Sequence, residues 1–448
     1  MDKLEDVLKI ISHFIWGNYL IALLIGVGIY FTFITKCIQV RGFSIAIKKI
    51  FRSNKELEKC TNGTLTPVQA LCLALSSCIG NGNIVGVATA IASGGPGAVF
   101  WMWFSGVLGM ATKYSEILIG MVYREKNEEG TFLGGPMYYL SKGLKWKKIS
   151  LIFSVLMLLQ ISGGALIQSN AVSAVAMQLF NISPLVTGVT MSLIVLTVVS
   201  GGIKRLGYIS EKLVIVMSII YITGGLIVIT LNFHNFFDSL MLIIKSAFNF
   251  ESVGGGVLGY SMKEAMRFGL ARGLYSNEAG EGSAPVIHST AISDHPTNQA
   301  FLGVIEVFFD TMIICSLTSF VIITSGVYLT DISPVLYIMT AFSSIHPSFK
   351  YIIGISMMLF AFSTILSQWY FGTVSLTYIF NSKFAKNFKY PFMSLTIIGA
   401  LSSLDAVWYI QDIVLGIMII PNLIGIVALS GDVKKYTDDF FINKLYNK

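Results

Sequence analysis

The sequence predicts an all-α polytopic membrane protein with about eleven transmembrane helices. Hydrophobic residues make up 54% of the 448 residues, and the mean hydropathy is +0.72. Charged residues make up only 12%, about half of the roughly 25% that is usual in soluble domains. None of them occurs between residues 66 and 112 or between residues 149 and 203. Because about 20 apolar residues span a bilayer, each of these blocks is long enough for a transmembrane helix.

The individual spans follow from dividing the apolar runs at glycine, proline and charge clusters. The first run is too long for a signal-peptide core and follows a slightly acidic N-terminus, so we interpret it as a retained helix. The predicted spans are 14–35, 66–92, 98–122, 149–180, 183–201, 213–232, 260–289, 299–328, 351–381, 391–405 and 408–429.

The eleven predicted spans form a single transmembrane domain, residues 1–448, that divides into one helix and two sets of five. The extra N-terminal helix is 14–35, the first set covers 66–232 and the second covers 260–429. Since five is an odd number, two such sets lie in the membrane with opposite orientations. This is the inverted-repeat arrangement of many secondary transporters.

Basic residues cluster in alternate loops between the predicted spans. The net charge of +7 would be compatible with nucleic-acid binding in a soluble protein, but here the basic residues are topology determinants. The positive-inside rule places the N-terminus outside and the C-terminus in the cytoplasm, in a bacterial-type inner membrane. The basic loops contain Lys36, Arg41, Lys48, Lys49, Arg52, Lys55 and Lys59, then Arg124, Lys126, Lys142, Lys145, Lys147 and Lys148, then Lys204, Arg205 and Lys212, and finally Lys383, Lys386 and Lys389.

Cysteine and histidine give no sign of a metal centre or of an enzyme. The five cysteines form no CxxC pair, and the five histidines show no metal-ligand spacing. No convergent group of histidine, cysteine and carboxylate residues within the spans suggests catalysis. We therefore expect a protein that is not an enzyme.

The second predicted span contains a polar, glycine-rich interruption. Residues 76–83 read Ser-Ser-Cys-Ile-Gly-Asn-Gly-Asn, ending in Gly80, Asn81, Gly82 and Asn83. Each glycine costs about 1 kcal/mol in a helix, and freed backbone groups at membrane depth are tolerated where they line a cavity. A broken helix would offer amides to a carboxylate and carbonyls to a cation. The alternative is a glycine notch for helix packing.

The seventh predicted span combines glycines with ionisable residues. Residues 268–282 contain Arg272, Tyr275, Asn277, Glu278 and Glu281. A charge at the bilayer centre costs at least about 2.5–3.5 kcal/mol unless it is paired or hydrated. Either a salt bridge at the cytoplasmic end, involving Arg272 or Glu278, or an inner gate explains these charges.

Two further predicted spans contain polar pairs. Gln168 and Asn170 lie in the fourth span, where interhelical hydrogen bonding and substrate contact are both open. Ser363 and Thr364 lie in the ninth span and could offer hydroxyl oxygens to a hard cation. Hydrogen bonds to their own backbone are the alternative.

Motifs along nearly the whole chain resemble the alanine/glycine:cation symporter family, also called the sodium:alanine symporters. The matching strings are TPVQA at 66–70, GNGNIVGVATA at 80–90, GGPGAVFWMW at 94–103, GMATKY at 109–114, GGPMYY at 134–139, RGLYSNEAG at 272–280, DHP at 294–296 and IPNL at 420–423. The resemblance implies the five-plus-five inverted-repeat fold of the bacterial leucine transporter with one extra N-terminal helix. It also implies sodium-driven uptake of small neutral amino acids, such as alanine and glycine, by alternating access.

The resemblance also implies roles for individual residues. The amides near Asn81 and Gly82 would bind the substrate carboxylate. Carbonyls of Ser76 and Ile79 and hydroxyls of Ser363 and Thr364 would bind the sodium ion, which is the only cofactor expected. The residues expected at the substrate are Gly80, Asn81, Gly82, Asn83, Gln168, Asn170, Tyr275, Asn277 and Gln368.

Some positions depart from the pattern of the family. Asn81 replaces a usual threonine, Gln368 replaces a usual tryptophan, and Glu281 and Glu306 stand where apolar residues or glycine are usual. Our hypothesis is a pocket that is roomier or more polar than an alanine pocket and accepts serine or glutamine.

Other functions stay open. Proton coupling through Glu281, Glu306 or Asp310 is the nearest alternative, and a membrane channel or sensor is less favoured. The expected partners are the amino acid substrate and the lipid bilayer, without nucleic acid or an obligate protein partner.

Overall fold

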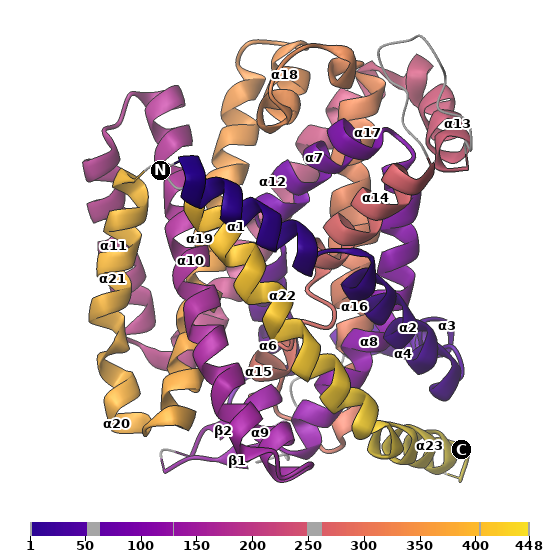
Figure 1. Ribbon diagram of the computed structural model, residues 1–448, viewed down its shortest axis with the longest axis vertical. Helices are drawn as coiled ribbons and strands as arrows, with labels where there is room; N and C mark the ends of the chain where they lie inside the picture. The colour runs from indigo at the N-terminus through magenta and orange to yellow at the C-terminus, as the bar shows by residue number, and fades with distance from the viewer. Residues whose placement is uncertain (1, 52–62, 129, 249–261, 403–404, 447–448) are drawn as a thin grey trace.

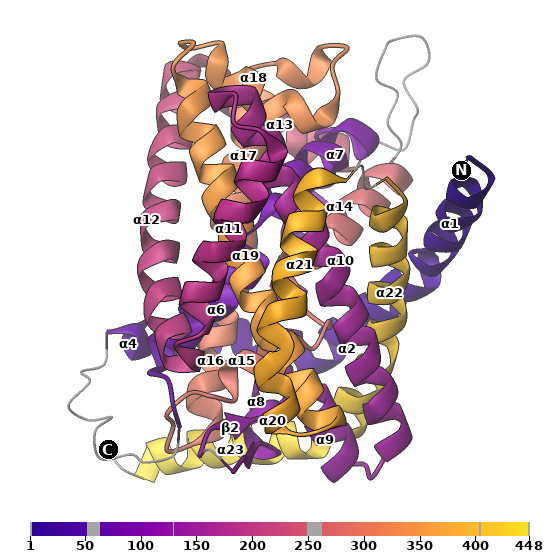
Figure 2. The same cartoon turned by 90° about the vertical axis from the view of Figure 1, so that its left-hand side faces the viewer.

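Long helices run side by side between two ends of the molecule (Figures 1 and 2). The computed structural model describes residues 2–51, 63–128, 130–248, 262–402 and 405–446. Within these residues, the strands are limited to one short antiparallel pair, β1 (Glu125–Lys126) and β2 (Phe132–Leu133). The architecture of the described chain is therefore helical, as predicted.

The helices of the first half are those up to residue 247. They are α1 (Asp2–Ile15), α2 (Asn18–Ile34), α3 (Ile38–Arg41), α4 (Phe43–Ile50), α6 (Pro67–Cys78), η1 (Asn81–Asn83), α7 (Val85–Gly94), α8 (Ala98–Val122), α9 (Pro136–Lys142), α10 (Lys147–Phe180), α11 (Pro184–Val199), α12 (Gly202–Leu231), η2 (Phe233–Asn235) and α13 (Phe236–Ala247).

The helices of the second half follow from residue 262. They are α14 (Met262–Asn277), α15 (Ala284–His288), α16 (Pro296–Val307), the π-helical η3 (Phe308–Cys315), α17 (Ser316–Thr324), η4 (Val327–Leu329), η5 (Pro334–Leu336), α18 (Tyr337–Ser343), α19 (Phe349–Ile379), α20 (Ser382–Ala385), η6 (Lys386–Phe388), α21 (Lys389–Leu401), α22 (Asp405–Ala428) and α23 (Ser430–Tyr446).

The chain is a multi-pass membrane protein. Six helices of the described residues are long and apolar enough to cross a membrane. The segment of α6, η1 and α7, which is bent by 59°, is a seventh if its two parts form one broken span. Large apolar side chains are exposed on outer helices, such as Leu185, Val186 and Leu193 of α11. Soluble proteins rarely expose such continuous apolar surface, so this surface faces lipid.

Each predicted span overlaps a helix or a series of consecutive helices, such as α16, η3, α17 and η4 for 299–328. The number of eleven spans and the inverted repeat nevertheless stay predictions. Only six helices, or seven with the bent segment of α6 and α7, are long and apolar enough to cross a membrane among the described residues. The predicted start of the seventh span at residue 260 lies outside the described residues, as do residues 403–404 of the tenth span, 391–405. Arg52, Lys55 and Lys59 of the first basic loop also lie outside them.

The predicted loop with Lys204, Arg205 and Lys212 is instead helical. Helix α12 begins at Gly202, so the predicted start at residue 213 was wrong. Long basic side chains can extend along a helix while the charge stays at the surface, and the ammonium of Lys212 lies 4.3 Å from the centre of the Tyr208 ring. Charge alone was therefore not a sign of a loop.

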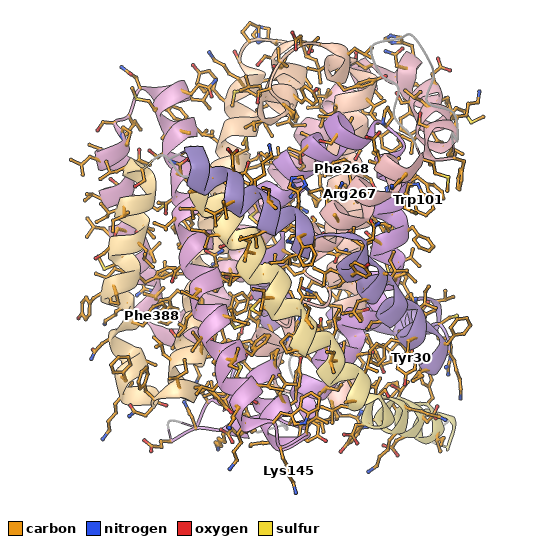
Figure 3. All side chains as sticks on the ribbon, in the orientation of Figure 1. Tyr30, Trp101, Lys145, Arg267, Phe268 and Phe388 are labelled. Carbon is orange, nitrogen blue, oxygen red and sulfur yellow. The ribbon has the colours of Figure 1, made fainter. Side chains whose placement is uncertain are left out.

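Short elements cover the two ends of the helix bundle. Helices α13 and α18 lie at the upper end in Figure 1, and α9, the strand pair and α23 lie at the lower end. Lys145 lies at this lower end (Figure 3). The interrupted helices α6–α7 and α14–α15 lie inside the bundle, between the two ends.

Candidate functional site

The interruption predicted in the second span is confirmed. Helix α6 begins with a capping box, in which Thr66 accepts a hydrogen bond from the Gln69 amide and the Gln69 side chain accepts one from Thr66. It ends at Cys78, and Gly80 is extended (φ −137°, ψ −159°). The Gly80 amide donates to Asn83 Oδ1 at 2.9 Å. A side chain thus replaces a helical bond at the break, as buried backbone groups require.

The seventh span is interrupted between α14 and α15. Glu278 and Gly280 both have positive φ, of 53° and 94°, which ends the helix. The Gly280 amide donates to Glu116 Oε2 at 3.2 Å, and Asn422 Nδ2 donates to the Gly280 carbonyl at 2.8 Å. Side chains from α8 and α22 therefore satisfy the backbone of this second break. Non-helical backbone at membrane depth is tolerated where protein groups satisfy it in this way.

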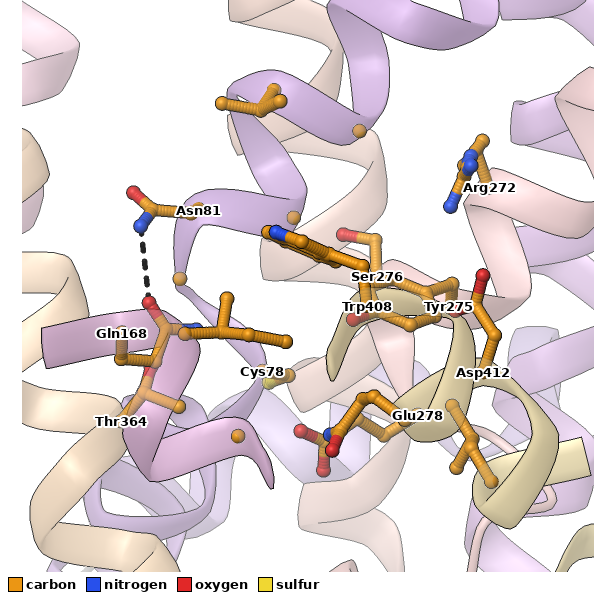
Figure 4. Close-up of a pocket in the computed structure, with 18 of the residues that line it drawn as sticks. Cys78, Asn81, Gln168, Arg272, Tyr275, Ser276, Glu278, Thr364, Trp408 and Asp412 are labelled. Carbon is orange, nitrogen blue, oxygen red and sulfur yellow. Dashed lines mark hydrogen bonds between the residues drawn. The ribbon is translucent and has the colours of Figure 1, made fainter. Parts of the chain in front are cut away.

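A cavity of about 420 Å³ lies beside the two breaks (Figure 4). Side chains of α10, α19 and α22 complete its walls. Asn81 Nδ2 donates to Gln168 Oε1 at 3.1 Å across this space. Seven of the residues predicted from the sequence line the cavity: Gly80, Asn81, Gly82, Gln168, Tyr275, Thr364 and Gln368.

Three predicted substrate contacts lie outside the cavity lining. Asn83 is fully buried and donates to Asp310 Oδ1 at 2.5 Å, and Asn277 is fully buried and donates to Thr311 at 3.3 Å. Asn170 donates to two carbonyls near the end of α21, at 3.3 and 2.7 Å. In this structure these three side chains hold backbone or helices in place and do not contact the cavity.

The end of α6 contacts α19 through oxygen atoms. Ser363 Oγ lies 3.3 Å from the Ser76 carbonyl oxygen, and Thr364 Oγ1 lies 3.4 Å from the Ser77 carbonyl oxygen. Both hydroxyls also lie closer to the Phe360 carbonyl oxygen of their own helix, at 2.8 and 3.1 Å, so the predicted alternative of hydrogen bonds to their own backbone is confirmed. Ser76 and Ile79 are fully buried. Of the four residues predicted to bind sodium, Ser76, Ser363 and Thr364 therefore lie at this contact, and Ile79 follows the end of α6 by one residue. Carbonyl and hydroxyl oxygens are the ligands that hard cations prefer.

Charged side chains also line the cavity. Glu278 accepts hydrogen bonds from Ser77 at 2.8 Å and from Ser283 at 2.5 Å. Arg272 and Asp412 point toward one another at the cavity (Figure 4). Within the described chain, neither Arg272 nor Glu278 takes part in an ion pair. The predicted alternative of a cytoplasmic salt bridge is therefore not supported.

A second buried polar group lies behind the cavity and was not predicted from the sequence. The ammonium of Lys113 in α8 lies 3.0 Å from Glu306 Oε1, and both side chains are at most 1% exposed. His288 Nε2 lies 3.0 Å from the other carboxylate oxygen, and Gln299 bonds to the opposite ring nitrogen at 2.7 Å. A lysine in the middle of the predicted span 98–122 was the available signal. A buried charge needs a partner, so a carboxylate from another span was to be expected.

Asp310 is surrounded by neutral donors. Asn83, Ser276 and Thr311 each donate to its carboxylate, the latter two at 3.0 Å. It links the second span, the seventh span and the π-helical segment of the eighth. Because its oxygens are bonded to these donors and lie outside the cavity lining, its first role is to connect the two interrupted helices.

Comparisons with known proteins agree on one kind of molecule. The model of the family described as "Sodium:alanine symporter family" matches residues 1–448. The chain is 38% identical to the transporter YflA of Bacillus subtilis, over 100% of this chain and 95% of that protein. It is 36% identical to the sodium/alanine symporter AgcS of Methanococcus maripaludis, over 96% of both. It is 34% identical to the probable sodium/glutamine symporter GlnT of Bacillus subtilis, over 95% of this chain and 88% of that protein.

Solved structures show the same fold at low identity. The transporter MhsT in complex with L-phenylalanine matches with a TM-score of 0.56 and 15% identity, over 80% of this chain and 89% of that chain. A sodium-coupled sialic acid symporter matches with a TM-score of 0.56 and 12% identity, over 87% and 84%. These are transporters of the leucine-transporter type that the motifs implied, and they show the fold alone.

Proposed function

The chain belongs to the sodium:alanine symporter family, and from this premise we propose that it couples sodium entry to the uptake of small neutral amino acids. Alanine and glycine are the first substrates, and larger polar amino acids extend the range. The relatives' names include both an alanine and a glutamine symporter. The family consists of transporters, so the chain is not an enzyme.

The observation that carries the proposal is a cavity formed where helices are interrupted. Asn81 and Gly82 open the segment after the break and line the cavity. The start of a helix carries partial positive charge and exposed amides, which suit the carboxylate of an amino acid. Gln168 and Tyr275 line the same space and would surround the rest of the substrate.

The sodium site of this proposal lies at the contact of α6 with α19. Carbonyl oxygens of Ser76 and Ile79 and hydroxyl oxygens of Ser363 and Thr364 would bind the ion. Thr364 also lines the cavity, so ion and substrate would share one wall.

Coupling follows from this shared wall. A bound sodium would hold the end of α6 against α19 and thereby order the amides of Asn81 and Gly82 that bind the substrate. Each ligand would then favour the conformation that the other requires. No covalent chemistry is involved.

Alternating access would use the two repeats, residues 66–232 and 260–429. The basic lower end of the bundle, with Lys145 (Figure 3), would face the cytoplasm of a bacterial-type cell. This places the N-terminus outside and the C-terminus inside. Thr89 of α7 and Val335 of η5 also line the cavity. Helices α7 and α18 lie toward the upper end of the bundle in Figure 1, so in this conformation the cavity would be reached from the outside.

Proton coupling is the second candidate, and the geometry favours it less. Glu306 contacts Lys113 and His288 and lies outside the cavity lining. Asp310 is bonded to three neutral donors and also lies outside the lining. Of the three candidate carboxylates, Glu281 is the one that lines the cavity, where it accepts a hydrogen bond from Gln160 at 3.1 Å. Proton coupling would therefore depend on Glu281.

The test is uptake of labelled alanine into proteoliposomes that contain the purified protein. An inward sodium gradient should drive accumulation, and an equal potassium gradient should not. Liposomes without protein provide the control for leakage. Accumulation that follows an imposed pH gradient and ignores sodium would favour proton coupling instead, and equilibration without accumulation would favour a channel.

A further inference from the structure

Two buried glutamines of the cavity have unsatisfied side chains. Gln368 of α19 is 6% exposed and Gln411 of α22 is 5% exposed, and both line the cavity. The amide oxygen of each has no hydrogen-bond partner in the described residues. Buried polar atoms nearly always have a partner, and each exception needs an explanation. A ligand in the cavity would supply the missing partners.

The ends of the two glutamines pack against a pair of glycines in α10. A Cβ atom at Gly164 would lie 2.2 Å from Gln368 Nε2, and a Cβ atom at Gly163 would lie 2.3 Å from Gln411 Oε1. Both distances are far below van der Waals contact. Adjacent glycines thus admit the ends of two long amide side chains from different helices. The two glycines of α10 therefore make room for the ends of Gln368 and Gln411 at the wall of the cavity.

Further hydrogen-bond acceptors line the same cavity. Glu281, 6% exposed, lines the cavity and accepts a hydrogen bond from Gln160 of α10. Asn81 Oδ1, opposite Gln168, is also buried and without a partner in the described chain. The cavity lining therefore includes three amide oxygens, of Asn81, Gln368 and Gln411, that lack a partner within the described residues. An alanine methyl group in it would leave these groups unsatisfied.

We propose that Gln368 and Gln411 form a subsite for the side chain of the transported amino acid, and that this side chain ends in a carboxamide, as in glutamine. The subsite rests on the proposed function, since it extends the same cavity. A carboxamide has two donors and one acceptor, so it pairs with a glutamine amide in either orientation of that amide. A substrate with an apolar side chain would leave the buried glutamine oxygens without partners, and buried polar groups without partners are costly. The subsite would therefore favour a carboxamide over an apolar side chain.

A neutral carboxamide fits this wall better than a cationic side chain. The carboxylate of Glu281 already accepts a hydrogen bond from Gln160, and Arg272 lines the same cavity and would repel a second cation. Moving a charged side chain from water into the membrane interior is also far more costly than moving an amide. The cationic alternative is retained as an outcome of the experiment.

The experiment measures uptake of labelled glutamine and labelled alanine by the full-length protein in proteoliposomes under an inward sodium gradient. Wild type should transport both. Gln368→Leu and Gln411→Leu should each lower the ratio of kcat/KM for glutamine to that for alanine by about 10-fold, the upper range for one lost neutral hydrogen bond. Gln178→Leu is the matched control, because Gln178 is exposed near the end of α10, and it should leave the ratio unchanged.

The other outcomes separate the two proposals. If wild type transports neither amino acid, the proposed symport fails and the subsite fails with it. If alanine uptake is sodium-driven but excess glutamine does not inhibit it, symport stands and the subsite is refuted. A proportional loss of both rates in Gln368→Leu and Gln411→Leu would show that these residues only support the fold, which also refutes it. Stronger inhibition of alanine uptake by lysine than by glutamine would overturn the carboxamide assignment.

Discussion

A methyl group added at Gly80 tests whether sodium binds where α6 meets α19. Gly80 has extended backbone angles that alanine also adopts, so the effect of Gly80→Ala comes from space alone. The new Cβ atom would lie 2.9 Å from Thr364 Oγ1 and 3.5 Å from Gln168 Nε2. The first distance is too short, so the hydroxyl of Thr364 has to move.

The expected size of the effect follows from overpacking. Extra atoms in a well-packed interior cost about 1–3 kcal/mol. If this cost falls on the sodium-bound state, the sodium affinity drops by about 5- to 140-fold, because each 1.4 kcal/mol is tenfold. Thr364 Oγ1 is one of the proposed ligands and also lies 3.4 Å from the Ser77 carbonyl oxygen, so the displaced atom belongs to the ion site itself.

The assay is the sodium concentration that gives half-maximal alanine uptake in proteoliposomes. Gly80→Ala should raise it by the factor above. Gly26→Ala in α2 is the control, since its Cβ atom would meet nothing within 4 Å, and the sodium dependence should stay at the wild-type value. Transport by Gly80→Ala with wild-type sodium dependence would refute the location of the sodium site.

Three further predictions concern other contacts. The double variant Ser363→Ala plus Thr364→Ala removes two proposed ligand oxygens and should weaken sodium dependence before alanine binding; unchanged sodium affinity would contradict it. Glu306→Gln should destabilise the protein by about 3–5 kcal/mol, because Lys113 keeps a buried charge without its counterion, whereas adding Lys113→Met should restore most of the loss in thermal unfolding in detergent. Asn170→Ala removes two hydrogen bonds to backbone carbonyls and should lower the unfolding temperature, because about 1 kcal/mol of stability is lost per bond. A large change in the KM for alanine would instead indicate that Asn170 contacts the substrate.

Much of the helix pattern could be predicted because lipid exposure leaves a strong signal in the sequence. An interruption at residues 76–83 was predicted because glycine and asparagine stand in an otherwise apolar run, and the helix is broken between Cys78 and Val85. The extent of α12 was not predicted, because Lys204 and Arg205 resemble loop residues although they belong to a helix. Elements such as α13 and α18 at the upper end were also missed, since helices this short lack the length of a membrane span.

The site was predicted in part, because only residues next to a helix break could be placed from the sequence. Residues next to a break, such as Asn81 and Thr364, face the cavity because the break itself forms it. The direction of a side chain on an unbroken apolar helix cannot be predicted from periodicity, so Asn170 was placed at the substrate although it bonds to α21. The pairing of Gln368 and Gln411 with two glycines was equally hidden, because it joins three helices distant in the sequence.

The most direct test of the coupling between sodium and amino acid is calorimetric binding of alanine to the purified protein in detergent, with sodium or with choline as the only cation. If sodium orders the amides that bind the substrate, its presence should tighten alanine binding by about 5- to 150-fold, the usual range for coupling between two sites. The same alanine affinity in sodium and in choline would contradict the proposed coupling, even if the protein transports alanine.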